Sequence, residues 1–146
     1  MHSYKIIIPQ TKEELDAYYR LRYEILRKPW GQDIKTNRDE WEAISLHALM
    51  IDEQGDAVAT GRLQLNSEQE GQIRSMAVVD ALQGKGLGSN MLKFLEDKAR
   101  EKKLSEIVLD ARDHAAEFYR KNGYEVVGDS YVLFGTIPHF RMRKKL

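Results

Sequence analysis

The sequence lacks cysteine, and it also lacks any long hydrophobic run. Without cysteine, the chain cannot form disulfide bonds, use a thiolate nucleophile or bind a metal ion through sulfur. Its four histidines show no ligand spacing, so we expect no metal site. No stretch approaches the roughly 18 apolar residues of a membrane-spanning helix, and the N-terminus has no apolar signal core. These absences favour a cytoplasmic protein that has no membrane partner.

An excess of charge of either sign is also missing. The 23 lysines and arginines balance 23 aspartates and glutamates, which gives a formal net charge of zero. Nucleic-acid binding normally requires a basic excess, so we expect no nucleic-acid partner. The short basic stretch over residues 141–145 is expected to be the solvated end of a strand. With 42% hydrophobic and 32% charged residues among 146, the composition predicts one folded domain over residues 1–146.

A glycine-rich turn over residues 83–89 is the most informative stretch that is present. A strand-like run over 72–79 precedes it, and apolar residues at helical spacing follow it to about residue 102, which predicts a helix with one buried face. The first N–H groups of a helix have no partner within it, and the helix dipole adds roughly half a positive charge there. Because three glycines let a bulky anion approach the backbone, the turn predicts a pyrophosphate site.

Three nucleotide-binding patterns compete for this turn. A Walker loop requires Ser or Thr directly after its Gly-Lys pair, but here Gly86 follows Lys85. A dinucleotide fingerprint requires G-x-G-x-x-G, and only Asp110, about twenty residues further on, agrees with it. The third pattern, Q-x-x-G-x-G, is matched by Gln83, Gly86 and Gly88.

Strand and helix signals alternate along the rest of the chain. We expect a helix over residues 12–26, where Thr11 and Glu14 have capping-box spacing, then a loop over 28–33 and a short helix over 38–44. Within the first helix, Arg22 lies on the apolar face, and we expect its stem to pack on the core with its head in water. Another short helix is expected over 114–122. Strands are expected over 4–8, 45–51, 57–65, 72–79, 106–110, 124–127, 131–135 and 137–142. This order predicts an α/β fold, a central mixed β-sheet with helices on both faces.

Three ordered blocks and one further stretch resemble the GNAT superfamily of N-acetyltransferases. The pattern Q-x-x-G-x-G is similar to its acetyl-CoA signature, and residues 118–125 resemble its F-Y-x-K-x-G-F segment. Residues 135–142 and 21–26 resemble the G-I-P-H-x-x-M ending and the L-R-x-x-V-F helix of the ElaA-like branch. Two departures stand out. Arg112 occupies a position where many members carry Asn, and the loop over 28–32 does not match that branch's acidic segment.

The resemblance implies acetyl transfer from acetyl-CoA directly to an amine, with no covalent enzyme intermediate and no metal. Tyr119 is the implied group beside the leaving thiolate. A phenol with pKa near 10 and a thiol with pKa near 8.5 differ by about 1.5, which favours a hydrogen bond over full proton transfer. The alternative is a core tyrosine bonded to a backbone carbonyl. The implied cofactor contacts come from the main chain of the strand before the glycine-rich turn, from the turn itself and from the arginine that replaces the family's Asn. They are Met76, Ala77, Val78, Gln83, Gly84, Lys85, Gly86, Leu87, Gly88, Ser89 and Arg112.

The acceptor side of the predicted site is less well defined. We expect the acceptor amine to lie among four residues, Arg22, Glu24, Trp30 and His139. The candidates for the general base are Glu24, Asp110, His114 and His139, of which His139 has the most suitable ordinary pKa, near 6.5. A structural hydrogen-bonding role for His139 and a core-capping role for Trp30 are the alternatives.

The acceptor itself stays open between a small-molecule amine and a protein amine, and a homodimer is compatible with the sequence. A non-catalytic acyl-CoA-binding or sensing module on the same fold is the alternative function. A nicotinamide-dependent oxidoreductase is a more distant one.

Overall fold

In the computed structural model, which describes residues 3–133 and 137–146, one mixed sheet has the strand order β1-β2-β3-β4-β5-β7-β6. Among the described strands, all neighbours pair antiparallel except β4 and β5. The bounds are β1 (Lys5–Ile7), β2 (Leu46–Ile51), β3 (Ala57–Leu65), β4 (Glu70–Val78), β5 (Glu106–Arg112), β6 (Glu125–Leu133) and β7 (Ile137–Lys145). The predicted strands over 124–127 and 131–135 are one strand, β6, and residues 134 and 135 lie outside the described residues.

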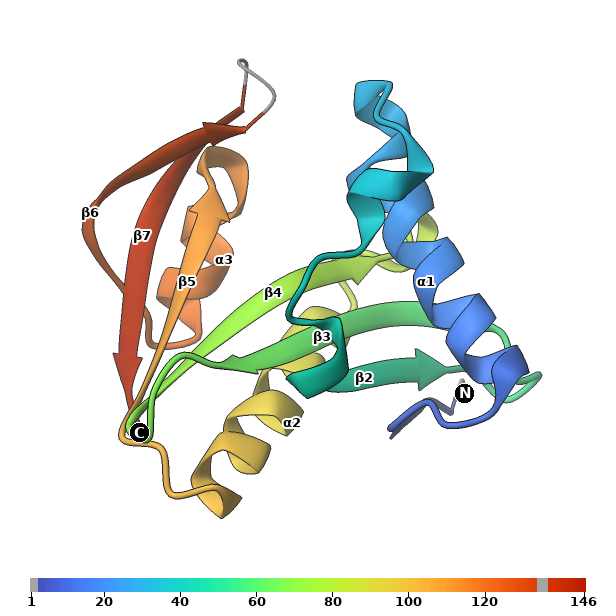
Figure 1. Ribbon diagram of the computed structural model, residues 1–146, viewed down its shortest axis with the longest axis horizontal. Helices are drawn as coiled ribbons and strands as arrows, with labels where there is room; N and C mark the ends of the chain where they lie inside the picture. The colour runs from blue at the N-terminus through green and yellow to red at the C-terminus, as the bar shows by residue number, and fades with distance from the viewer. Residues whose placement is uncertain (1–2, 134–136) are drawn as a thin grey trace.

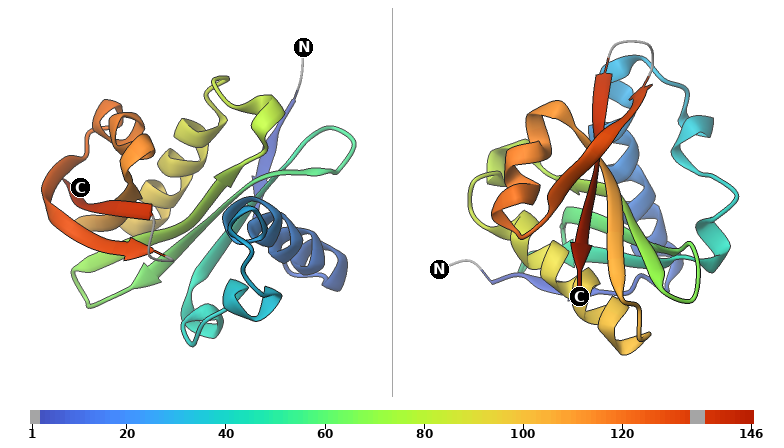
Figure 2. Two further views of the ribbon diagram at one scale, coloured as in Figure 1. Left: turned by 90° about the horizontal axis from the view of Figure 1, so that it is seen from above. Right: turned by 90° about the vertical axis from the view of Figure 1, so that its left-hand side faces the viewer.

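Helices cover both faces of the sheet, as the sequence predicts (Figures 1 and 2). The helix α1 (Lys12–Leu26) packs on one face, and α2 (Leu87–Glu101) and α3 (Ala116–Lys121) pack on the other. The expected capping box begins α1, because the Glu14 N–H donates to Thr11 Oγ1 at 3.1 Å and the Thr11 N–H donates to the Glu14 carboxylate. The apolar face of α2 is fully buried through Met91, Leu92, Leu95 and Ala99.

The two parallel strands β4 and β5 separate soon after they begin. They pair only over the three positions Glu70–Gln72 of β4, and beyond Gln72 they diverge (Figure 1). A bulge bends β4 at this point, since Ser75 and Met76 together lie opposite Gly61, and Ser75 has a φ of 56°. The Thr60 hydroxyl holds the bulge by donating to the Ser75 carbonyl at 2.9 Å. The divergence opens a gap in the middle of the sheet.

The segment between α1 and β2 differs from its prediction. The helix expected over 38–44 forms only as a 3-10 turn over its last three residues, because Arg38 is extended and the Asp39 carboxylate accepts from the Trp41 N–H at 2.9 Å, which competes with helical hydrogen bonds. The loop expected over 28–33 also contains a helical turn. Three short 3-10 turns occupy this segment, η1 (Lys28–Trp30), η2 (Ile34–Asn37) and η3 (Glu42–Ile44). Two more, η4 (Asp80–Leu82) and η5 (Asp113–Ala115), precede α2 and α3.

A buried ionic network fixes this segment against the sheet. Arg22 is only 2% exposed, so the expectation that its head lies in water is wrong. Its guanidinium donates to Glu42 at 2.8 Å, and the fully buried Arg62 of β3 donates to Glu42 at 2.6 Å and to Asp39 at 3.0 Å. Burial of an arginine requires such compensation, because an unpaired charge loses its hydration. The network therefore joins α1, η3 and β3 on the α1 face of the sheet.

Candidate active site

Two cavities meet where β4 and β5 diverge. The strand-gap cavity, of about 370 Å³, is lined by β4 from Gln72 to Val78, by β5 from Leu109 to Arg112 and by the C-terminal part of α1. The glycine-turn cavity, of about 470 Å³, lies beside the start of α2 and reaches Phe118 of α3. The two cavities share a wall that consists of Met76, Ala77, Val78, Gln83, His114, Ala115 and Tyr119.

The glycine turn presents bare backbone to its cavity. Gly84 and Gly86 have φ values of 80° and 83°, a left-handed conformation that side chains disfavour, and Gly86 begins α2 without a side-chain cap. At Gly88 a side chain is disfavoured by packing, because a Cβ there would lie 3.1 Å from Phe118 Cζ. Gly88 thus also makes room for α3, besides the approach of an anion that the sequence predicts.

Some residues of the turn line its cavity, and others hold the turn in place. Gly84, Gly86, Leu87, Gly88 and Ser89 line the glycine-turn cavity, whereas Lys85 lines neither cavity. The Gln83 amide donates to the Val78 carbonyl and to Asp80 Oδ1, both at 3.2 Å. Gln83 thus ties the turn to the end of β4.

Tyr119 lies on the wall shared by the two cavities, and its hydroxyl is not hydrogen-bonded to any described residue. Its ring is 8% exposed and packs edge to face on Phe118, at a centroid distance of 5.0 Å. Within residues 3–133 and 137–146 its hydroxyl has no hydrogen-bond partner, so the alternative of a tyrosine bonded to a backbone carbonyl is wrong. Burial raises the pKa of Tyr119 to about 12, and Arg112 partly opposes this rise. The hydroxyl therefore stays protonated near neutral pH and can donate.

His139 of β7 lines the strand-gap cavity and is 5% exposed. Its Nδ1 lies 3.0 Å from the Ile137 carbonyl, and its ring stacks on Tyr131 at 4.5 Å. Because a carbonyl only accepts, Nδ1 carries the proton and Nε2 keeps the lone pair. Burial lowers the pKa of His139 below its usual 6.5, which keeps the ring neutral at pH 7.

The other predicted bases have less suitable surroundings. The Asp110 carboxylate lines the strand-gap cavity but already accepts from Ser130 at 2.7 Å, from Arg141 at 3.1 Å and from Gln72 at 3.3 Å. The exposed His114 lies on the shared wall. Among these groups, His139 combines burial, a fixed tautomer and a position in the cavity.

The structure does not bring together all four residues expected around the acceptor. Arg22 and His139 line the strand-gap cavity, whereas the exposed Glu24 lines neither cavity. Residues two apart on a helix face different directions, so Arg22 and Glu24 of α1 cannot both point into one cavity. Trp30 also lines neither cavity and is 41% exposed. Its ring lies 5.7 Å from the guanidinium carbon of Arg112.

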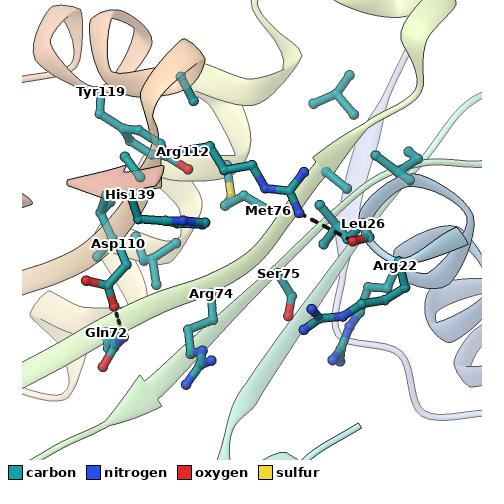
Figure 3. A pocket seen from close by; sticks show the side chains of 18 of the residues that line it. Arg22, Leu26, Gln72, Arg74, Ser75, Met76, Asp110, Arg112, Tyr119 and His139 are labelled. Carbon is teal, nitrogen blue, oxygen red and sulfur yellow. Dashed lines mark hydrogen bonds between the residues drawn. The ribbon is translucent and has the colours of Figure 1, made fainter. Parts of the chain in front are cut away.

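Two arginines of the strand-gap cavity, Arg27 and Arg74, were the main feature that sequence reasoning missed. They line this cavity together with Arg22 and Arg112. Figure 3 shows Arg22, Arg74 and Arg112 around it. Arg112 points toward α1 and donates to the Leu26 carbonyl at 3.3 Å, on the opposite side of the gap. The sequence did contain a signal that Arg74 lies on a polar face of the sheet. Polar residues alternate with apolar ones along two neighbouring strands, namely Arg62, Gln64, Gln72 and Arg74.

Neither a metal site nor a membrane span is found in the part of the chain that the structure describes. Among those residues, no group of three or more acidic or histidine side chains could hold a metal ion. No helix there has both the length and the apolar character needed to cross a bilayer.

A family model described as the acetyltransferase (GNAT) family matches residues 13–124. A Bacillus subtilis (strain 168) protein, named uncharacterized N-acetyltransferase YjcF, is 30% identical over 141 residues, which cover 96% of this chain and 99% of the relative. The structure of an aminoglycoside 6'-N-acetyltransferase complexed with coenzyme A has a TM-score of 0.80 at 14% identity, over 97% of this chain and 96% of that chain. Escherichia coli ElaA has a TM-score of 0.74 at 20% identity, over 99% of each chain. At these identities the two structures establish a shared fold.

Proposed function

The chain belongs to the acetyltransferase (GNAT) family, and from this premise we propose that it transfers an acetyl group from acetyl-CoA directly to the amine of an acceptor. One observation carries the proposal. The hydroxyl of Tyr119, which has no hydrogen-bond partner among the described residues, lies on the wall shared by two cavities, one beside bare helical N–H groups and one beside a buried neutral histidine. We assign the whole activity to one domain over residues 1–146.

The glycine-turn cavity fits the diphosphate of coenzyme A. Gly84 and Gly86 leave open space where a Cβ would stand, and the first N–H groups of α2 have no side-chain cap. Among the described strands, none pairs with the edge of β4 from Ile73 to Val78 on the β5 side, so its peptide groups fit the amides of the pantetheine arm. The coenzyme A of the structural neighbour supports this assignment.

Acetyl-CoA supplies the acetyl group as a thioester. In the proposed reaction, His139 Nε2 accepts the proton that the amine loses as its nitrogen bonds to the acetyl carbon. Tyr119 donates a hydrogen bond to the sulfur as the carbon–sulfur bond breaks. The pKa of about 12 for Tyr119 lies roughly 3.5 above the ordinary thiol value, so stabilisation by a hydrogen bond is favoured over full proton transfer.

The acceptor is not carried over from any relative. The aminoglycoside named for the structural neighbour belongs to a chain of 14% identity, at which only the fold is shared. The match to the acetyltransferase family leaves no support for the nicotinamide-dependent alternative.

The proposed function is tested by two measurements on the purified chain. Calorimetry should detect acetyl-CoA binding, and release of coenzyme A should accelerate with at least one member of a panel of amines. Tight acetyl-CoA binding without acetyl transfer to any amine would instead support the non-catalytic acyl-CoA-binding module.

A further inference from the structure

The strand-gap cavity has an unbalanced positive charge. Four arginines and two aspartates line it: Arg22, Arg27, Arg74, Arg112, Asp39 and Asp110. Both aspartates already form ion pairs with arginines outside the cavity lining, Asp39 with Arg62 at 3.0 Å and Asp110 with Arg141 at 3.1 Å. Arg22 is paired with Glu42. Neither aspartate is hydrogen-bonded to Arg74 or Arg112.

Arg74 and Arg112 are the two arginines whose surroundings call for an anion. In the described ranges, the side chain of the half-buried Arg74 has no hydrogen bond or ion pair, although its charge helps to lower the pKa of Asp39. Arg112 contacts a carbonyl oxygen of α1 and the Trp30 ring, but no carboxylate of the described residues pairs with it. Partly buried cations without a counter-charge cost free energy, and such arrangements are concentrated at functional sites.

The arginines also repel one another across the cavity. Burial lowers the pKa of Arg27, and the charges of Arg112, Arg22 and Arg74 lower it further. Burial likewise lowers the pKa of Arg112. A bound anion would relieve this repulsion, whereas a second cationic group would add to it.

Resting on the proposed function, we infer that the acceptor amine carries an anionic group, a carboxylate or a phosphate, that pairs with Arg74 and Arg112. The planar guanidinium group matches the geometry of both anions. Tyr119 and His139 line the same cavity of about 370 Å³, so the amine and the anion belong to one small molecule or to one chain end. The inference disfavours polyamines and aminoglycosides as acceptors.

The anion site is distinct from the proposed diphosphate site. Arg74 and Arg112 line the strand-gap cavity only, and neither lines the glycine-turn cavity. A change at Arg74 should therefore weaken transfer to an anionic acceptor more than transfer to its neutral partner, whereas a change at the diphosphate site should weaken both alike. This difference separates the anion site from an additional contact to coenzyme A.

Matched probes test the inference by measuring kcat/KM for acetyl transfer. The pairs are the twenty amino acids against their carboxamides, and glucosamine 6-phosphate against glucosamine, with spermidine as the polycationic probe. We expect at least one anionic probe to be preferred over its neutral partner by about tenfold or more, as for one charge-assisted hydrogen bond. The carboxylate and phosphate pairs show which anion is bound.

Arg74→Gln should remove most of this preference, because kcat/KM falls more for the anionic probe than for its neutral partner. Arg112→Gln is the second variant. Arg20→Gln is the matched control, because Arg20 is exposed on α1 and lines neither cavity, and it should keep the full preference. A preference for neutral amines or spermidine, or full anion preference in both cavity variants, would overturn the inference.

The test also works if no amine is acetylated, an outcome that counts against the proposed function. The N-acetylated amino acids and their carboxamides are then titrated into the chain saturated with coenzyme A, with N-acetylglucosamine 6-phosphate and N-acetylglucosamine as the phosphate pair. Binding that requires the anion and is lost in Arg74→Gln supports the anion site. Equal binding, or none, contradicts it.

Discussion

Tyr119 and Tyr124 pack edge to face with ring centroids 5.8 Å apart, yet in the described part of the chain only the Tyr124 hydroxyl has a hydrogen-bond partner. Tyr124 donates to the buried Glu96 at 2.9 Å, and Lys144 donates to the other oxygen of that carboxylate at 3.0 Å. Tyr119 instead lies on the wall shared by the two cavities. Two adjacent tyrosines of similar burial thus have different surroundings, since Tyr124 is hydrogen-bonded in the core and Tyr119 lines both cavities.

Charge at the start of α2 should control acetyl-CoA affinity. Gly86→Glu and Gly86→Gln place side chains of equal size and equal backbone strain where a Cβ meets nothing within 4 Å. Only the glutamate repels a diphosphate, so its Kd for acetyl-CoA should be about tenfold or more weaker than that of the glutamine variant. Calorimetry on the two folded variants measures the difference. Equal Kd values would place the diphosphate elsewhere.

His139 should control kcat and its dependence on pH. His139→Asn keeps a donor for the Ile137 carbonyl but removes the Nε2 lone pair, so kcat should fall by about 10²-fold while acetyl-CoA affinity is unchanged. In the unsubstituted chain, kcat at saturating acceptor should decline below pH 6.5, because protonation of His139 removes the base. The variant should lack this decline. A variant that keeps both kcat and the decline would exclude His139 as the base.

Stability should decrease as the pH falls below 6.5. Burial lowers the pKa values of both His47 and His139 in the folded state, so the unfolded chain binds more protons in this range. The two histidines contribute fully to the free energy of unfolding above pH 6.5. This contribution is lost as the pH falls through their lowered folded-state pKa values. Each group can add a slope of at most about 1.4 kcal/mol per pH unit.

Urea unfolding between pH 8 and pH 5 measures this slope. The His47→Gln variant should have a shallower slope of the free energy of unfolding against pH. In the folded chain the neutral His47 ring is hydrogen-bonded to the Tyr18 hydroxyl and to the Glu42 carbonyl, each at 2.7 Å. A free energy of unfolding that is constant or rises toward pH 5 would contradict the assignment.

Local patterns were sufficient to predict most elements and part of the site. The capping box at Thr11, the helix after Gly86 and the buried strand β5 follow from residues close together in the sequence. Tyr119 and His139 were identified through short motifs, and the structure places both on the strand-gap cavity.

Features that depend on distant pairings could not be predicted in this way. Arg22 meets Glu42 twenty residues away, so a side chain expected in water is buried. The gap between β4 and β5 depends on a bulge at Ser75 and on pairing that ends at Gln72, and neither has a signature in sequence periodicity. The cluster around Arg74 exists only because this gap opens.

The role of Tyr119 at the thioester is the central claim. Tyr119→Phe removes one hydroxyl that makes no hydrogen bond within the described residues, so folding stability and acetyl-CoA affinity should barely change. Tyr124→Phe is the matched control. It leaves a buried carboxylate without one donor, so it should lower the free energy of unfolding by about 1–3 kcal/mol and leave the rate of acetyl transfer near that of the unsubstituted chain.

The most direct measurement is the single-turnover rate of acetyl transfer by Tyr119→Phe, with enzyme in excess over acetyl-CoA and a saturating acceptor that the unsubstituted chain acetylates. This experiment observes the chemical step without product release. We predict a rate about 10²-fold below that of the unsubstituted chain, because the departing sulfur loses its donor. A rate equal to that of the unsubstituted chain would contradict the account and leave Tyr119 as a core residue.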